Sequence, residues 1–312
     1  MKRTLIITAI FLPLLLQGQN DIQLSQQFLS RVNYNPAATG ASNYVNAFLI
    51  ARQQWIGFRE APSTQVLNAH SYFNQINSGM GLSVTNDRVG AAESSINAKF
   101  AYAYYLHFEE SYLAFGLGAG ILYKNVDVNK LRPESGRPES DPTLNAYIND
   151  RSNKVNPDFD FGVEFNMVNV QVGASVTHLH KSPLKIKNFE SGRHFYLYGK
   201  YTYQIDENWK IAPSLIGQLS AWPIMQIDVN ALATYKERFW FGLSFRSSES
   251  VIAESVVGIL GLYVTDFLGL GYSYDFNPGP LKKYSSGSHE ISLRVRISKG
   301  DDGGGKTPRF FE

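Results

Sequence analysis

The feature that most limits the possible folds is an alternation of polar and apolar residues that runs almost without interruption over residues 43–298. In the segment 94–108, for example, every second residue from 96 onward is apolar or aromatic. A period of two residues places these side chains on one face of a β-strand, whereas an amphipathic helix needs a period of about 3.6 residues. No segment keeps the helical period beyond a turn or two. The chain is therefore predicted to be essentially all β.

The alternation divides the chain into fourteen candidate strands. Bacterial outer-membrane barrels have even strand numbers, with strands of roughly 9 to 11 residues or somewhat longer. We therefore predict an all-β fold, a transmembrane antiparallel up-and-down β-barrel of about 14 strands. The candidate strands are 44–55, 63–74, 78–87, 94–108, 111–123, 158–166, 169–179, 193–205, 208–219, 224–235, 238–246, 251–264, 267–276 and 288–298.

The connections between these strands alternate in length. Every second connection is tight and polar: 75–77, 109–110, 167–168, 206–207, 236–237 and 265–266. Those between them are mostly longer, at 56–62, 88–93, 124–157, 180–192 and 277–287, with short exceptions at 222–223 and 247–250. Such sorting is typical of short periplasmic turns and longer extracellular loops. It places both the N-terminal segment and the C-terminal tail on the periplasmic side.

Each predicted strand has one face suited to lipid and one suited to a polar lumen. In 158–167, Phe159, Phe161, Val163 and Phe165 alternate with polar residues and Gly162, and in 288–298 the apolar set opposes Glu290, Ser292, Arg294 and Arg296. Charged side chains are costly in lipid and are tolerated in a lumen. Alternation does not say which face points inward, so a soluble barrel with an apolar interior stays open as an alternative.

The chain begins with two cationic residues, Lys2 and Arg3, followed by an apolar run over residues 4–16 that Pro13 interrupts. A transmembrane helix needs about 20 apolar residues, and the shorter run is typical of a cleaved secretion signal. We expect four segments: a signal peptide over 1–18, an N-terminal periplasmic or plug segment over 19–42, an outer-membrane barrel over 43–298 and a flexible tail over 299–312.

Composition excludes several classes of function. The chain has no cysteine, so it has neither a lipid-acceptor thiol nor disulfides nor thiolate metal sites. Removing Lys2 and Arg3 from the 29 basic residues leaves 27, which equals the 27 acidic residues. No basic excess remains for nucleic acid.

Three sequence blocks carry a family resemblance. They are NDIQLSQQFLSRVNYNPAATG from Asn20, ARQQWIGFREAPST from Ala51 and SGMGLSVTNDRVG from Ser78. In this order after a signal peptide, they resemble the PorP/SprF family, outer-membrane proteins of the type IX secretion and gliding motility machinery of Bacteroidota. Glu60 is one departure, because many members have Gly before Ala-Pro, and it predicts a less sharply turned loop.

The resemblance points to candidate motif and partner-binding positions. They are Asn35, Pro36, Ala37, Gly40, Arg52, Gln54, Trp55, Gly57, Ala61, Pro62, Asn86, Asp87, His289 and Glu290. An alternative interpretation of the same residues is turn and girdle architecture without a binding role.

The resemblance implies a non-enzymatic outer-membrane barrel that anchors or docks a secreted surface adhesin, periplasmic machinery components, or both. A passive porin-like channel is the main alternative. A membrane-embedded hydrolase using His70 with a serine stays open, because that chemistry needs only three residues brought together in space. It is the weaker alternative, because no local signature supports it. The mildly amphipathic residues 21–32 are predicted to plug the lumen or to dock a periplasmic partner.

No catalytic, cofactor-binding or metal site is predicted. The sequence contains no Gly-x-Ser-x-Gly elbow, Walker loop, dinucleotide fingerprint or His-Glu-x-x-His. His178 and His180 share a strand face as a metal pair would, but no third ligand lies nearby in the sequence. The loop 124–157, with its repeated Arg-Pro-Glu-Ser, and the tail 299–312 are candidate contacts for partner proteins.

Overall fold

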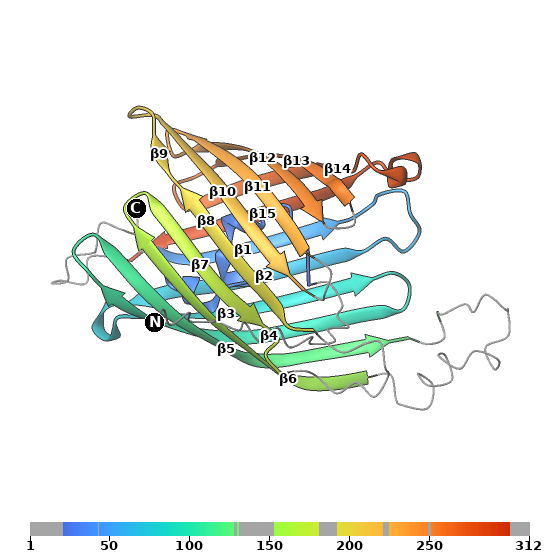
Figure 1. The fold of residues 1–312 in the computed structure, drawn as a ribbon, viewed down its shortest axis with the longest axis horizontal. Coiled ribbons are helices and arrows are strands. Elements are labelled where there is room, and N and C mark those ends of the chain that lie inside the picture. The colour runs from blue at the N-terminus through green and yellow to red at the C-terminus, as the bar shows by residue number, and fades with distance from the viewer. Residues whose placement is uncertain are drawn as a thin grey trace, which may run out of the picture.

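The computed structural model describes residues 21–42, 44–127, 130, 153–180, 192–220, 225–248 and 251–299. These residues form one 15-stranded sheet together with short 3₁₀ helices (Figure 1). The strands are β1 (Tyr44–Gln53), β2 (Ser63–Phe73), β3 (Ser78–Val89), β4 (Glu93–His107), β5 (Ser111–Val126), β6 (Asn153–Met167), β7 (Val170–Thr177), β8 (His194–Tyr201), β9 (Tyr203–Gln204), β10 (Trp209–Leu219), β11 (Met225–Tyr235), β12 (Phe239–Ser248), β13 (Val251–Tyr263), β14 (Leu268–Phe276) and β15 (Ser288–Ser298). The 3₁₀ helices include η1 (Gln27–Leu29), η2 (Arg31–Asn33), η3 (Pro36–Ala38), η4 (Asn74–Ile76) and η7 (Pro280–Lys283).

The sheet closes on itself. Except from β8 to β9, each strand pairs antiparallel with the next along the chain, and β15 pairs with β1 over residues 289–298 and 44–53. β9 continues β8 beyond Thr202, because both pair with β10, so the fifteen labelled strands occupy fourteen positions around the ring. The predicted antiparallel barrel of about 14 strands is therefore confirmed.

Most predicted strand ends agree with the structure to within two residues, but the connections after β3 and β5 were overestimated. β5 runs to Val126 and β6 begins at Asn153, so the expected loop 124–157 is shorter at both ends. Pro157 suggested a loop, yet it pairs with Ile121 within the β5–β6 ladder. Among the described residues the ladder between β6 and β7 begins at Phe161, so none of them needs the missing N–H of Pro157. The connection between β3 and β4 is likewise only 90–92.

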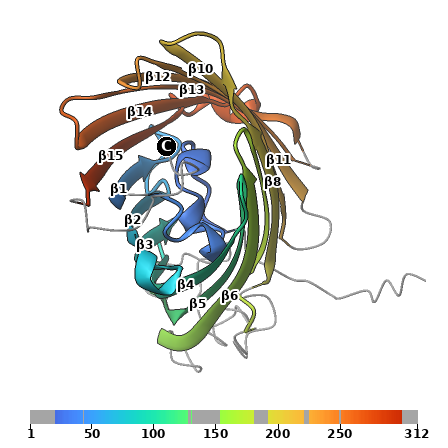
Figure 2. The ribbon, with the colours of Figure 1, turned by 90° about the vertical axis from the view of Figure 1, so that its left-hand side faces the viewer.

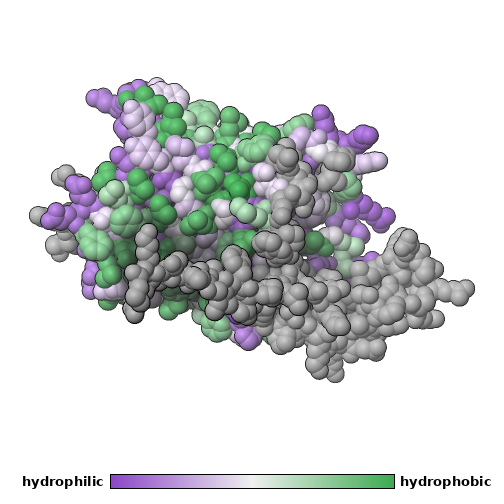
Figure 3. Space-filling model, in the orientation of Figure 1, coloured by the Kyte–Doolittle hydropathy of each residue, from purple (hydrophilic) through white to green (hydrophobic). Residues whose placement is uncertain are grey.

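Apolar side chains cover the outside of the barrel. Leu82, Leu197 and Leu243 are 60%, 64% and 68% exposed, whereas Glu164 and Glu290 point inward and are fully buried. Hydrophobic residues gather on the outer face of the strands, and hydrophilic ones are more frequent toward the two ends (Figure 3). The predicted lipid-facing residues Phe159, Phe161 and Phe165 follow the same rule. The alternative of a soluble barrel with an apolar interior is therefore wrong.

No helix in the described part of the chain is long and apolar enough to cross a membrane.

Residues 21–42 lie inside the barrel, and we call them the plug (Figure 2). The plug starts beside His178 and Tyr196 at the end with long loops, and it reaches the short-turn end at Gly40, close to Gly79. The expectation that the whole N-terminal segment lies on the periplasmic side is therefore wrong. It was inferred from where the first strand starts, but the plug runs the length of the lumen before the chain enters that strand.

The C-terminal end of β15 lies at the short-turn end, where Ser298 pairs with Tyr44. The Lys299 ammonium donates to the backbone carbonyl of Tyr72 nearby. The predicted signal peptide 1–18, the Arg-Pro-Glu-Ser repeat at 132–140 and the tail from 300 onward lie outside the described residues.

Candidate functional site

The Asn-Pro-Ala motif docks the middle of the plug onto the barrel wall. Asn35 caps η3 by accepting a hydrogen bond from the Ala37 N–H at 2.9 Å, and its amide donates to the Val163 carbonyl at 3.1 Å. The turn fits because the wall has glycine at two contact points. A Cβ on Gly116 would lie 2.1 Å from the Ala37 nitrogen, and one on Gly162 would lie 1.9 Å from the Asn35 side-chain oxygen.

A buried carboxylate of β6 holds the centre of the plug. The guanidinium of Arg31 donates from Nε to Oε2 of Glu164 at 2.9 Å, and the Glu164 side chain is fully buried. The hydroxyl groups of Tyr112 and Tyr198 also donate to this carboxylate. A buried charge needs such pairing and hydrogen bonding, because desolvation otherwise makes it very costly.

A second buried cluster holds the plug nearer the long-loop end. Arg52 of β1 contacts Asp275 at 2.8 Å and Glu290 at 3.4 Å. Glu290 in turn accepts hydrogen bonds from the backbone N–H groups of Ser25 and Gln26, at 2.8 and 2.9 Å. The Ser25 hydroxyl accepts from Arg52 and donates to Asp275. Two predicted positions, Arg52 and Glu290, therefore hold the plug inside the barrel.

The plug ends in a close approach of two glycines. Gly40 has a φ of +88°, and a Cβ at this position would lie 2.6 Å from the Cα of Gly79. The Gly40 N–H donates to Nδ1 of His70 at 3.1 Å. His70, the residue considered as a hydrolase base, is thus engaged by the plug backbone.

The remaining predicted positions lie around the long-loop end and do not form one surface. Gln54, Trp55, Pro62 and Asp87 line a cavity at this end, and the Ala61 carbonyl accepts a hydrogen bond from the Gln53 side chain. The other positions do not line this cavity. Gly57 packs against the backbone of Tyr284. Asn86 is hydrogen-bonded to the exposed Gln65, and His289 is hydrogen-bonded to Tyr272.

The loop around Glu60 does not relax as expected from the absent glycine. Glu60 adopts a φ of +61°, which is the left-handed conformation that a glycine would take at no steric cost. The prediction of a less sharply turned loop is therefore wrong.

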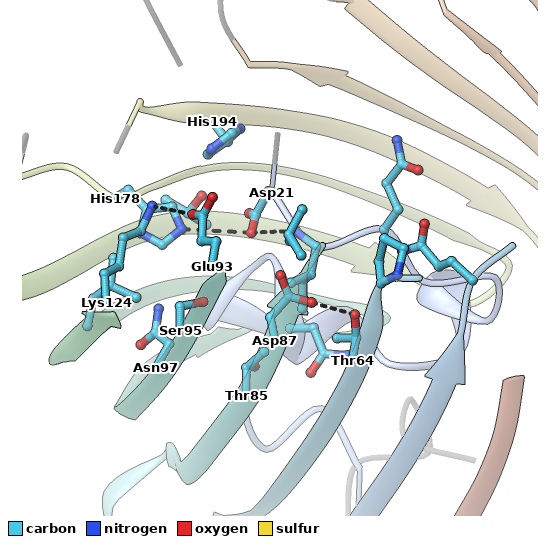
Figure 4. A pocket seen from close by; sticks show the side chains of 18 of the residues that line it. Asp21, Thr64, Thr85, Asp87, Glu93, Ser95, Asn97, Lys124, His178 and His194 are labelled. Carbon is cyan, nitrogen blue, oxygen red and sulfur yellow. Dashed lines mark hydrogen bonds and ion pairs between the residues drawn. The ribbon is translucent and has the colours of Figure 1, made fainter. Parts of the chain in front are cut away.

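The long-loop cavity has a volume of about 450 Å³ and contains the start of the plug (Figure 4). Asp21, His178 and His194 meet at its wall, and each offers one ligand atom within 4.8 Å of the other two. Sequence reasoning paired His178 with His180, but His180 is exposed. Antiparallel pairing of β7 with β8, in which Thr177 faces His194, instead brings the second histidine from sixteen residues away. Only the register between β7 and β8 indicates that His194 lies close to His178.

Asp21 and His178 carry opposite charges when no ligand is bound. Burial raises the pKa of the Asp21 carboxyl, but contact with His178 and the proximity of His194 outweigh it and hold the pKa well below its usual range. Burial and the Lys99 ammonium lower the pKa of His178, but contacts with Asp158 and Asp21 outweigh them and raise it to about 9. The plug is therefore tied to the wall electrostatically at this end.

The short-turn end has a second cavity, of about 630 Å³. Its charged lining is mainly basic, with Arg31, Lys210, Arg294 and Arg296 against Glu237. Residues of the plug line both cavities, so the plug lies between them. Those at the short-turn cavity are Leu29, Ser30, Arg31, Val32, Ala38, Ala41 and Ser42, and those at the long-loop cavity are Asp21, Ile22, Gln23 and Asn33.

One of two similar solved structures superposes well enough to support this architecture. The deltaS2S3 mutant of the monoaromatic hydrocarbon channel TodX shares 10% identity, covers 89% of this chain and 95% of its own, and superposes with a TM-score of 0.52. Omp33, an outer membrane protein of Acinetobacter baumannii, shares 11% identity over 83% of this chain and 100% of its own, with a TM-score of 0.46. At such identities the likeness to TodX shows the fold alone.

None of the curated proteins matches the chain. A family model described as "Type IX secretion system membrane protein PorP/SprF" matches residues 16–295. This family comprises secretion-system membrane proteins and is not a known enzyme family. The chain is thus an outer-membrane β-barrel that belongs to the PorP/SprF family of type IX secretion system membrane proteins.

Proposed function

We propose that this barrel is a closed, non-enzymatic anchor of the type IX machinery that docks a secreted surface adhesin, periplasmic machinery components, or both. The observation that supports this most is that the chain places its own residues 21–42 inside the lumen. Three side chains bind the plug through buried contacts: Glu164 to Arg31, Glu290 to the backbone at Ser25 and Gln26, and Arg246 to the Leu24 carbonyl at 3.1 Å. Such a barrel offers its two ends, and not a water-filled passage, for function.

A passive porin-like channel fits the structure less well. A fourteen-stranded barrel is wide enough to conduct unless it is plugged. Here the plug lies between the cavity at one end and that at the other. Conduction would require breaking ion pairs such as Arg31–Glu164, and removing one partner from a buried pair costs about 3 to 5 kcal/mol.

The basic short-turn cavity supports docking on the periplasmic side. Arg294 and Arg296 line this cavity together with plug residues 29–32, and Glu237, the one acidic residue among the described lining residues, is paired with Lys210 at 2.6 Å. An acidic segment of a periplasmic partner suits such a surface, because complementary charge speeds encounter and fixes orientation.

No specific observation favours a hydrolase. The Nδ1 atom of His70 accepts a hydrogen bond from the Gly40 backbone, and no serine hydroxyl bonds to His70 among the described residues. A histidine used in this way helps to hold the plug.

Three experiments test the proposal. Extraction of the outer membrane in mild detergent, followed by affinity purification of the tagged chain, should recover a surface adhesin or a periplasmic machinery protein. Deletion of the gene should strip that adhesin from the cell surface. A clean monomer, together with unchanged surface adhesin in the deletion strain, contradicts the anchoring role. Planar-bilayer recordings should be silent, and steady open channels favour the porin alternative instead.

A matched pair of variants locates the periplasmic contact. Replacing Arg294 and Arg296 together by Gln should reduce recovery of a periplasmic partner, because both residues line the basic cavity. Lys236→Gln removes an exposed charge from a neighbouring turn that does not line the cavity, so it should leave recovery unchanged. Equal loss in both variants would point to general charge effects.

A further inference from the structure

We infer that Asp21, His178 and His194 form a binding site for a divalent transition metal ion of the Zn²⁺ type, which locks the start of the plug to the barrel wall. The three residues come from three elements: the plug, the residue after β7 and the first residue of β8. The inference concerns a ligand of the barrel itself and does not depend on the proposed docking function.

The donor atoms and their spacing suit such an ion. Two imidazoles and one carboxylate are common ligands of Zn²⁺, and three protein ligands with an open fourth position are a familiar arrangement. The donor atoms all lie within 4.8 Å of one another, and Nε2 of His178 is 3.8 Å from Oδ1 of Asp21. Ligand bonds of about 2.0 to 2.1 Å place two tetrahedral ligands roughly 3.4 Å apart, so a small contraction completes the site.

An unsatisfied buried nitrogen is the second, independent observation. His194 is only 3% exposed, and its Nδ1 atom has no hydrogen-bond partner among the described residues. A buried polar atom without a partner is uncommon and needs a specific explanation. A metal ion bound through this nitrogen would supply one.

The surroundings already resemble the outer shell of a metal site. Metal-binding histidines usually donate their second ring N–H to a carboxylate or a carbonyl, which fixes the tautomer and the ring orientation. Nδ1 of His178 lies 3.0 Å from Asp158, which leaves Nε2 directed at Asp21. The Tyr196 hydroxyl donates to Oδ2 of Asp21 at 2.7 Å and so orients the third ligand.

Local charge also favours a dication. Lys99 contacts both Asp158 and Asp160, at 2.9 and 2.8 Å. With neutral histidines, these three residues and Asp21 contribute three negative charges and one positive charge, a balance of −2. The cavity lining repeats this balance, with Asp21, Asp87, Glu93 and Glu254 against Lys99 and Lys124. A divalent ion would bring the site close to neutrality.

An ion pair without metal explains only part of the arrangement. It accounts for Asp21 beside His178, but it assigns no partner to His194, whose ring packs edge to face on His178 with centroids 5.6 Å apart. The two interpretations therefore differ in what they predict for His194. A metal site loses an essential ligand with His194, whereas a simple ion pair does not need this residue.

Metal titration of the full chain, purified in detergent with a tag that contains no histidine, tests the site. After treatment with a chelator and its removal, calorimetry with ZnCl₂ should show one ion per barrel. Co²⁺ should give the intense visible absorption bands of a tetrahedral ion with nitrogen ligands. His194→Ala and Asp21→Asn should each weaken Zn²⁺ binding at least tenfold and abolish these bands.

His180→Ala is the matched control, because this exposed histidine lies two residues from His178 and outside the cluster. It should bind Zn²⁺ like the unmodified chain. Heat-dependent migration in gel electrophoresis shows whether each variant still forms a barrel. The inference is overturned if the unmodified barrel binds no stoichiometric Zn²⁺, or if His194→Ala binds it as tightly as His180→Ala does.

A second readout follows from the position of the ligands. Because Asp21 belongs to the plug, Zn²⁺ should slow proteolytic removal of the N-terminal segment and raise the melting temperature of the unmodified barrel, since the ion binds only the docked state. Neither effect should appear in folded Asp21→Asn. Protection that is equal in this variant contradicts a lock made through Asp21.

Discussion

Arg31 of the plug and Glu164 of β6, separated by 133 residues in the sequence, form an ion pair inside the barrel with an Nε to Oε2 distance of 2.9 Å. Glu164 is fully buried and also accepts hydrogen bonds from two tyrosines, Tyr112 and Tyr198. The pair joins the plug to the wall near the middle of the lumen. Its removal is the most direct way to test whether the plug keeps the barrel closed.

Arg31→Ala should loosen the plug. The substitution leaves the Glu164 carboxylate buried without its cation, and breaking such a pair costs about 3 to 5 kcal/mol. Part of this penalty is relieved if the plug leaves and water enters the lumen. We therefore expect a lower melting temperature, faster proteolysis of the N-terminal segment and measurable conductance in planar bilayers.

The exposed pair Lys210–Glu237 provides the control. Its ammonium and carboxylate lie 2.6 Å apart at the short-turn end, with side chains 35% and 68% exposed. Surface ion pairs contribute about 0 to 1 kcal/mol. Lys210→Ala should therefore change neither the melting temperature nor the conductance appreciably. If Arg31→Ala behaves like Lys210→Ala, the ion pair does not hold the plug.

The strands could be predicted from the sequence because their signal is local. The two-residue period that includes Phe159, Phe161 and Phe165 indicates which positions share a strand face, and turn residues mark where each alternating segment ends. The structure confirms the outward exposure of these three residues. Pro157 misled the prediction because a proline is excluded from a strand only where its missing N–H would be paired, and pairing is not visible locally.

The interior of the barrel could not be predicted in the same way. Resemblance identified Arg52 and Glu290 as candidate positions, but nothing local indicates that they meet each other and Ser25. His194 was missed as a partner of His178 because only the register of β7 on β8 brings them together. Contacts across a lumen depend on closure of the sheet, which couples residues far apart in the chain.

Gly116→Ala should dislodge the Asn-Pro-Ala turn. An added Cβ would lie 2.1 Å from the Ala37 nitrogen and 2.3 Å from the Pro36 carbonyl carbon, and neither backbone atom has room to move without undocking the plug. Overpacking of this kind costs about 1 to 3 kcal/mol or more. We expect a lower melting temperature and faster cleavage near residues 35–40 in limited proteolysis.

Gly258→Ala is the matched control for Gly116→Ala, because a Cβ at Gly258 meets nothing within 4 Å. It makes the same chemical change in β13 and should leave the protease pattern as it is in the unmodified protein. Similar cleavage near residues 35–40 in both variants would argue against a tight fit of the turn on Gly116.

Glu60→Gly should stabilise the barrel. Glu60 is held at a φ of +61°, a conformation that costs a non-glycine residue roughly 1 to 2 kcal/mol and costs glycine little. Glycine also loses more backbone entropy on folding, so the expected net gain is about 1 kcal/mol or less. Arg59→Gly, at a neighbouring position without positive φ, should be neutral or destabilising in the same thermal unfolding assay. Equal effects of the two substitutions would rule out relief of strain at Glu60.

The position of the membrane band can be tested with arginine substitutions. Leu243 lies in the middle of β12, points outward and is 68% exposed, whereas Ile205 follows β9 in a short turn and is 50% exposed. An arginine on the lipid face costs about 2 to 4 kcal/mol at the bilayer midplane and about 0 to 1 kcal/mol near the interface. Leu243→Arg should therefore reduce folding into lipid vesicles strongly, and Ile205→Arg only slightly. Because both substitutions place the same charge on an exposed apolar site, their difference reports depth in the membrane. Equal effects would mean that the bilayer does not centre on the middle of the strands.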